Sequence, residues 1–242
     1  VVDQNGIIVK SNFQRYQGKI NFQQKIGKKV TIDLLANYSR AITNGVTPTN
    51  AQQSSSATGW LVYSVWGYRP VKPRSQWEMD ANGNFINNDS GELIDEDVAS
   101  SNDYRFNPAK TVRNEYRKTI VDYLNANAGI TWEIIDDLKL KITGGYTINK
   151  RRREEFNGTQ TYTGYEGSPS GKGINGGIYW NDKMTWVNDN TLTYTKRFNR
   201  KHNFTFLAGF TLSGEKFDYK GTYATQMTTE ALGLNGLHTG SY

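Results

Sequence analysis

Apolar and polar residues alternate along six stretches of the chain. From Tyr16 to Ile26 the even positions are mostly apolar and the odd positions are polar. This two-residue period is typical of β-strands, whose successive side chains point to opposite faces of a sheet. The apolar positions of the six stretches are Tyr16, Gly18, Ile20, Phe22 and Ile26; Val30, Ile32, Leu34, Ala36 and Tyr38; Leu124, Ala126, Ala128, Ile130 and Trp132; Leu138, Leu140, Ile142, Gly144, Tyr146 and Ile148; Trp186, Leu192, Tyr194 and Phe198; and Phe204, Phe206, Ala208, Phe210 and Leu212.

Short turns join these stretches into three hairpins. The turns are Gly27-Lys28-Lys29, Ile135-Asp136-Asp137 and Asn199-Arg200-Lys201, whereas residues 42–117, 150–183 and 214–242 form long loops. All short connections are therefore expected at one end of the sheet and all long ones at the other. Transmembrane barrels show this asymmetry, and long structureless loops are uncommon in compact soluble domains. We expect an all-β fold: an antiparallel transmembrane β-barrel segment of about six strands with long extracellular loops.

The lengths and ends of the predicted strands also favour a membrane. Alternation over about eleven residues matches a tilted membrane-spanning strand. Aromatic residues near the strand ends suit the two interfacial girdles of a barrel, and lysines on the polar positions suit a water-filled lumen. The aromatics are Tyr16, Tyr38, Trp132, Tyr146, Trp186 and Phe198, and the lysines are Lys19, Lys25, Lys139 and Lys141. In a soluble sheet the same residues would pack in the core and face solvent.

Six strands are too few to close a barrel, since the smallest single-chain bacterial barrels have about eight. Unpaired strand edges are not tolerated in lipid. We therefore expect an internal fragment of a larger barrel. The sequence at Val1 has no features of a signal peptide, so an outer-membrane protein of this sequence is expected to lack its start.

Composition narrows the function classes. Hydrophobic residues make up 36% of the chain and the mean hydropathy is −0.70. No apolar stretch approaches the ~18–20 residues of a transmembrane helix. The absence of cysteine excludes disulfides and thiolate metal sites. The net charge of +6 is scattered among acidic residues, so nucleic acid is not an expected partner.

Several short segments, taken in order, resemble the SusC/RagA-type TonB-dependent transporters of Bacteroidetes. They are Ser11–Tyr16, Lys19–Phe22, Gln24–Ile26, Tyr38–Arg40, Tyr68–Pro73, Asn107-Pro108, Asn114, Leu138–Lys141, Asn190–Tyr194 and His202–Phe210. The resemblance implies that residues 1–242 belong to one barrel domain of about twenty-two strands whose plug is absent from this sequence. It also implies the outer membrane of a Gram-negative bacterium, a SusD-like surface lipoprotein partner and energy from TonB through a missing N-terminal region. The implied function is uptake of oligosaccharides or peptides, without enzymatic activity or a cofactor.

Aromatic residues of the long loops are the candidate cargo contacts. They are Trp60, Tyr63, Trp66, Tyr68 and Trp77 in the first loop and Tyr179 and Trp180 in the second. Flat aromatic faces stack on sugar rings or clamp peptide side chains. Residues 52–67 are predicted to form a short helix, so packing within the loop is favoured for Trp60. For Tyr179 and Trp180, cargo contact and packing both stay open.

The remaining motifs are weak. Gly171, Gly173 and Gly176 spell G-x-G-x-x-G, but a dinucleotide site needs a strand before them and a helix after them.

Asp80–Asn84 fits a hairpin turn better than a calcium loop, although the acids of 92–97 remain candidates for a hard cation. His202 and His238 are too few for a histidine-based active site, and we predict no enzyme. Lys150–Arg153 suits either lipopolysaccharide phosphates or a solvated charge run. The alternative function is a secreted β-rich carbohydrate-binding module.

Overall fold

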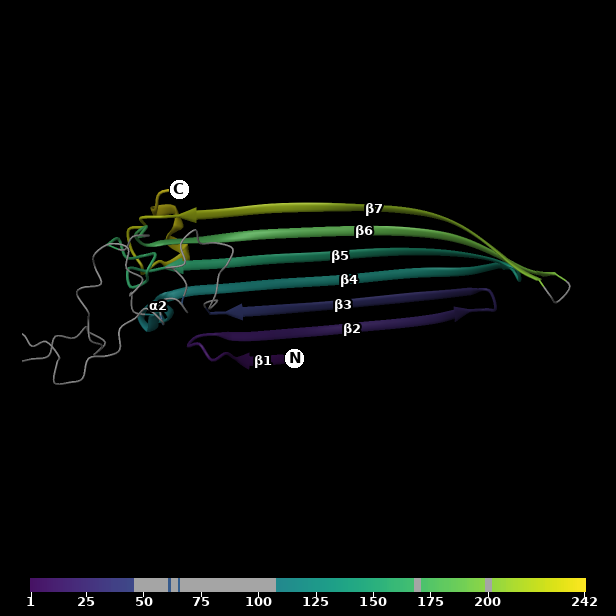
Figure 1. Cartoon of the computed structure of the whole chain (residues 1–242), viewed down its shortest axis with the longest axis horizontal. Helices are drawn as coiled ribbons and strands as arrows, with labels where there is room; N and C mark the ends of the chain where they lie inside the picture. Colours follow the sequence, from purple (N-terminus) through teal and green to yellow (C-terminus); the bar gives the residue numbers. More distant parts are fainter. Residues whose placement is uncertain (46–60, 62–64, 66–107, 168–170, 199–201) are drawn as a thin grey trace, which may run out of the picture.

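A computed structural model describes residues 1–45, 61, 65, 108–167, 171–198 and 202–242. Within this part the chain forms one antiparallel sheet of seven strands that follow one another in sequence order (Figure 1). The strands are β1 (Val2–Asn5), β2 (Asn12–Ile26), β3 (Val30–Asn44), β4 (Glu115–Ile135), β5 (Leu138–Asn157), β6 (Asn175–Phe198) and β7 (His202–Ala224). Helix α2 (Pro108–Asn114) precedes β4, and the 3-10 helix η4 (Gly233–Thr239) follows β7. Neither these helices nor the described helical residues Leu61 and Val65 form a segment long and apolar enough to cross a membrane.

The three predicted hairpins are confirmed as β2–β3, β4–β5 and β6–β7. The strand ends that are joined within each hairpin lie at one end of the sheet, whereas the strand ends that lead from one hairpin to the next lie at the other, here called the loop end (Figure 1). Strand β1 was not predicted. It pairs with the start of β2 across residues 6–11, which places one short connection at the loop end, contrary to the prediction. Its four residues are too short for an alternation signal, and the Asn12 amide ties it to Asp3 at 2.8 Å.

The predicted loop boundaries are corrected, because the strands continue well past the apolar alternation. The second loop is 158–174 rather than 150–183, and the segment after β7 is 225–242 rather than 214–242. Likewise β3 runs to Asn44, beyond the expected loop start at 42. The backbone ladder continues there because strand pairing does not need an apolar side chain at every second position. The predicted helix of 52–67 is described only at Leu61 and Val65, and both residues are helical.

Pairing in β2–β7 places even-numbered residues on one face of the sheet and odd-numbered residues on the other, here called the even face and the odd face. In the middle of the sheet the even face is apolar and exposed. Ile20, Phe22, Ile130 and Phe210, for example, have exposed fractions of 64%, 50%, 47% and 61%. This apolar band ends toward the loop end at one registered row of charges: Arg40, Asp122, Lys150, Asp182 and Asp218.

The buried apolar core of the described residues lies at the loop end. Ala224, Met227 and Leu237 are buried there, and partly buried neighbours pack against them: Phe156, Ile174, Ile178 and Leu234. Because Phe156, Ile178 and Ala224 belong to the even face, the segment after β7 folds back over that face beyond the charged row. The sheet is thus covered at the loop end and left uncovered over its apolar band.

Candidate functional site

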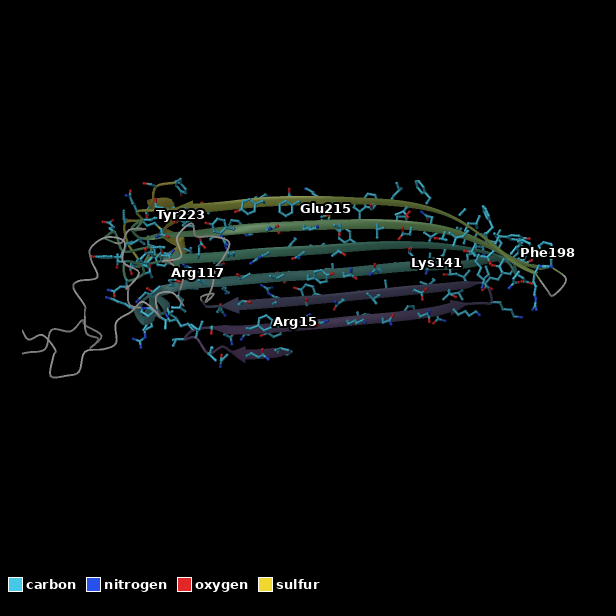
Figure 2. The ribbon with its side chains drawn as sticks, in the orientation of Figure 1. Arg15, Arg117, Lys141, Phe198, Glu215 and Tyr223 are labelled. Atoms are coloured by element: carbon cyan, nitrogen blue, oxygen red, sulfur yellow. The ribbon has the colours of Figure 1, made fainter. Side chains whose placement is uncertain are left out.

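The odd face of the sheet is mainly polar over its middle, and two open hollows lie there among the described residues. One hollow of about 550 Å³ is lined by Asn125, Asn127, Thr147, Thr185, Ser213 and Glu215. The other, of about 450 Å³, is lined by Asn21, Asp33, Asn127, Lys141, Thr143 and Asp189. Figure 2 shows that this face runs the length of the sheet, with Arg117 and Tyr223 at the loop end, Glu215 between and Lys141 nearer the turns. The odd face is therefore the candidate inner wall.

Side chains of this wall are tied to one another across the strands. The Asn127 amide donates to Asn125 Oδ1 at 2.6 Å, and the Asn125 amide donates to Thr147 Oγ1 at 2.9 Å. Lys183 Nζ lies 2.9 Å from Glu215 Oε2 on the neighbouring strand. Such pairing fixes the side chains and leaves a surface of amides, hydroxyls and mixed charge.

Tyr179 lies on the odd face near the loop end and belongs to a fixed cluster. The Arg153 guanidinium lies 4.6 Å from the centre of the Tyr179 ring, and the hydroxyl donates to Glu155 Oε1 at 3.0 Å. Burial, together with the Glu155 carboxylate, raises the pKa of Tyr179 well above that of a free phenol. The hydroxyl therefore stays protonated and keeps donating to Glu155.

Trp180 points to the even face, because it follows Tyr179 in the same strand. Its ring is 37% exposed, and the Arg152 guanidinium lies 5.8 Å from the ring centre. Arg152 also pairs with Glu154 at 2.7 Å, and Glu154 accepts a 2.8 Å hydrogen bond from Tyr116. Burial and the Glu154 carboxylate raise the pKa of Tyr116 to about 12. Tyr179 and Trp180 thus lie on opposite faces and do not form one contact surface.

Buried amides hold the loop end of the odd face together. The Asn157 amide donates to Asn175 Oδ1 at 2.8 Å, and the Asn175 amide donates to the Gly173 carbonyl at 2.7 Å. Arg117 Nη2 donates to Asn157 Oδ1 at 2.6 Å, and the Tyr223 hydroxyl donates to Asn175 Oδ1 at 3.2 Å. These residues gave no signal in the sequence, because their role depends on pairing between β4, β5, β6 and β7.

The comparisons with known proteins agree with this geometry. No known protein-family profile matches the chain. The chain is 25% identical over 221 residues to TonB-dependent receptor P3 of Formosa agariphila, an alignment that covers 91% of the chain and 20% of that receptor. Its fold matches the structure of the RagAB peptide transporter with a TM-score of 0.65 and 18% identity over 96% of the chain and 23% of the solved chain. The RagAB peptide importer in its open-open state gives a TM-score of 0.64 and 19% identity over 99% of the chain and 24% of the solved chain.

The chain resembles a barrel segment of a SusC/RagA-like TonB-dependent transporter. The predicted family resemblance and the predicted all-β, antiparallel fold are thereby confirmed. The chain spans about 20% of the length of the curated relative that it matches.

In this SusC/RagA-like segment the basic run Lys150–Arg153 does not form one cluster. Lys150 and Arg152 lie on the even face, whereas Arg151 and Arg153 lie on the odd face. Lys150 stands in register between Asp122 and Asp182, and Arg152 pairs with Glu154. Only half of the run therefore faces the side that a lipid headgroup would occupy.

The other predicted sites of the SusC/RagA-like segment fall into two groups. The first group lies outside the described residues: the loop aromatics Trp60, Tyr63, Trp66, Tyr68 and Trp77, and the segments 80–84 and 92–97. Gly176 lies within β6, so the G-x-G-x-x-G motif is followed by a strand and not by the helix that a dinucleotide site needs. His202 begins β7, and His238 Nδ1 lies 3.0 Å from the Asn235 carbonyl. Across the described ranges no group of three or more acidic, histidine or cysteine side chains is arranged to hold a metal ion.

Proposed function

We propose that the chain is part of the wall of an outer-membrane TonB-dependent importer of the SusC type. The observation that carries this proposal is the exposed apolar band of the even face. Trp132, Trp186 and Phe210 are exposed there by 46%, 45% and 61%, while the hollows of the opposite face are lined mainly by polar side chains. A soluble protein rarely exposes an apolar surface of this extent, whereas lipid solvates it. The band therefore speaks against the alternative of a secreted carbohydrate-binding module.

The depth of the band fits the proposal. On β7 the apolar even positions run from Phe204 to Leu212, and Asp218 stands in the charged row beyond them. A tilted strand crosses the hydrocarbon layer with about 9–11 residues. The outward Lys150 and Arg152 then lie at the height of lipopolysaccharide headgroups, where cations pair with phosphates. The short turns within the hairpins face the periplasm, and the loop end faces the outside.

Import through such a wall needs no chemistry on the cargo. The inner wall supplies water, paired charges and amides, so oligosaccharides or peptides can move along it without being trapped. In the proposed function a SusD-like lipoprotein closes the loop end over the cargo. TonB supplies the energy.

Fluorescence quenching in membranes tests the orientation of the wall. Phe210→Cys and Thr211→Cys are introduced singly into the intact transporter, labelled with bimane and reconstituted with lipids that carry a nitroxide in the acyl chain. The proposal expects strong quenching at position 210 and weak quenching at the neighbouring position 211. Equal quenching at both positions, or an intact protein that stays soluble without detergent, contradicts it.

The import step and the partner are tested in cells. Deletion of TonB should abolish uptake of the cargo while leaving the transporter in the outer membrane. An affinity tag on the intact transporter should co-purify a surface lipoprotein from detergent extracts. Uptake that continues without TonB contradicts the energy source, and purification without a lipoprotein contradicts the lid.

A further inference from the structure

The apolar side of β7 changes along its length. From Phe204 to Leu212 the even positions are apolar, whereas the odd positions are Thr205, Leu207, Gly209 and Thr211 and carry no aromatic ring. Beyond Gly214 the pattern is reversed, because Lys216, Asp218 and Lys220 occupy even positions while Phe217, Tyr219 and Tyr223 occupy odd ones. The strand thus carries its large aromatic side chains outward in the first half and inward in the second.

This reversal is not caused by a bulge. The pairing of β6 with β7 continues without a register shift from Gly176↔Ala224 to Phe198↔His202. Phe217 and Tyr219 therefore lie on the same odd face as Glu215, which lines the larger hollow. In sequence they lie between Glu215 and Tyr223, and Tyr223 is at the loop end of the strand (Figure 2).

In the proposed function the two rings lie beyond the hydrocarbon layer. Asp218, which stands between them, belongs to the charged row that ends the apolar band. Neither lipid solvation nor the packed core at the loop end explains rings on the odd face at this height. Phe217 and Tyr219 are exposed by 56% and 62%, unlike Tyr179 and Tyr223, whose hydroxyls are bonded within the wall.

The neighbours of these rings show what they can bind. Tyr219 is in register with Asn181, and Phe217 is in register with Lys183. Lys183 is neutralised by Glu215 at 2.9 Å, so an amide and two aromatic faces are the main groups offered. β7 is the edge strand of the described sheet, and in the closed barrel of the proposed function its free edge pairs with a further strand, so the backbone there cannot hydrogen-bond an extended peptide. Flat aromatic surface beside an amide fits a sugar ring, whose faces are apolar and whose edge carries hydroxyls.

We propose that Phe217 and Tyr219, with Asn181 beside them, form a sugar-stacking subsite on the inner wall, above the membrane. The proposal rests on the proposed function, because it places the odd face inside a transporter and names an oligosaccharide as the occupant. It locates a cargo contact on the strands rather than in the long loops. The subsite would hold one ring of the chain as it enters from the loop end.

A retention experiment on the intact transporter tests the subsite. The purified protein is incubated either with mixed oligosaccharides from partial hydrolysis of several polysaccharides or with a tryptic digest of casein, and retained molecules are identified by mass spectrometry after gel filtration. Oligosaccharides should be retained, and retention should fall about tenfold in Phe217→Ala and in Tyr219→Ala, because each variant loses a stacking face. Tyr219→Phe should retain oligosaccharides almost as well as the parent protein.

Phe206→Ala is the matched control, because Phe206 lies on the even face of the same strand and should not change retention. Unfolding temperature on gels verifies that each barrel is folded. Retention of peptides in place of oligosaccharides, no retention by the parent protein, or unchanged retention in the alanine variants overturns the subsite. If the subsite is overturned but lipid quenching and TonB-dependent uptake are as expected, the proposed function still holds. If those two measurements fail, both the proposed function and the subsite are contradicted.

Discussion

The indole of Trp186 lies over Gly214, its partner on the neighbouring strand. A Cβ atom added at Gly214 would stand 2.5 Å from Trp186 Nε1 and 2.8 Å from Cε2, too close for any side chain. The ring therefore covers backbone that the missing side chain leaves open on the even face. Trp186 is also one of the aromatics predicted to form a girdle, and in the proposed function the glycine fixes the position of this ring at the membrane interface.

Gly214→Ala should therefore destabilise the barrel. Displacing the indole is an overpacking change, which costs about 1–3 kcal/mol. Gly144→Ala is the matched control, because Gly144 also lies on the even face and has nothing within 4 Å of an added Cβ. Urea unfolding of the intact protein in detergent, followed by tryptophan fluorescence, measures both variants. Equal midpoints for the two substitutions would show that the Trp186 contact is not tight.

Asn175→Ala should loosen the loop end without unfolding the wall. The substitution leaves the buried Asn157 amide without its acceptor and removes the bonds to Gly173 and Thr163, at a cost of about 1–3 kcal/mol. Limited proteolysis should then cut the 158–174 connection faster. Asn203→Ala, at an exposed position near the turns, should leave the cleavage rate unchanged. A stable connection in Asn175→Ala would contradict the role of this amide.

The alternation of apolar and polar residues predicted the strand segments that have one apolar and one polar face. It missed the segments that are held in the sheet by backbone pairing without such a pattern. Between Tyr16 and Leu212 one face had to be apolar, so the three hairpins and their turns could be found. Past Ile148 both faces of β5 carry charge, and the continuing strand resembled a loop. Strand β1 is too short to show any period.

The candidate site was harder to predict for the same reason. Treating 214–242 as a loop hid the aromatic reversal at Phe217 and Tyr219, although the parity of these positions was visible. Treating 150–183 as a loop grouped Tyr179 with Trp180, which neighbouring positions of one strand place on opposite faces. The Asn157–Asn175 bond depends on the register of distant segments, which no local pattern reveals.

Glu115 makes the loop end sensitive to pH. Burial raises the pKa of Glu115 above its ordinary value of 4.5, with partial compensation by Arg117 and a further rise from Glu155. The folded state then binds the proton more tightly than the unfolded state. The contribution of protonated Glu115 to the free energy of unfolding is therefore fully present below pH 4.5 and is lost as the pH rises through the raised pKa. Glu115→Gln should flatten this dependence. The measurement is the urea midpoint of the parent protein and of Glu115→Gln at several pH values from below 4.5 to neutral. The same dependence of the midpoint on pH in both proteins would contradict the prediction.

Arginine substitutions at two adjacent positions of β4 should separate the lipid-facing side from the lumen. Ala128 lies in the middle of the apolar band, whereas Asn127 lies on the odd face and lines both hollows. Ala128→Arg places a charge in the hydrocarbon layer at a cost of about 2–4 kcal/mol. Asn127→Arg keeps its charge in water and loses only the hydrogen bond to Asn125, at about 1 kcal/mol. Unfolding free energies in lipid vesicles measure the difference, and equal costs at the two positions would mean that the even face does not meet lipid.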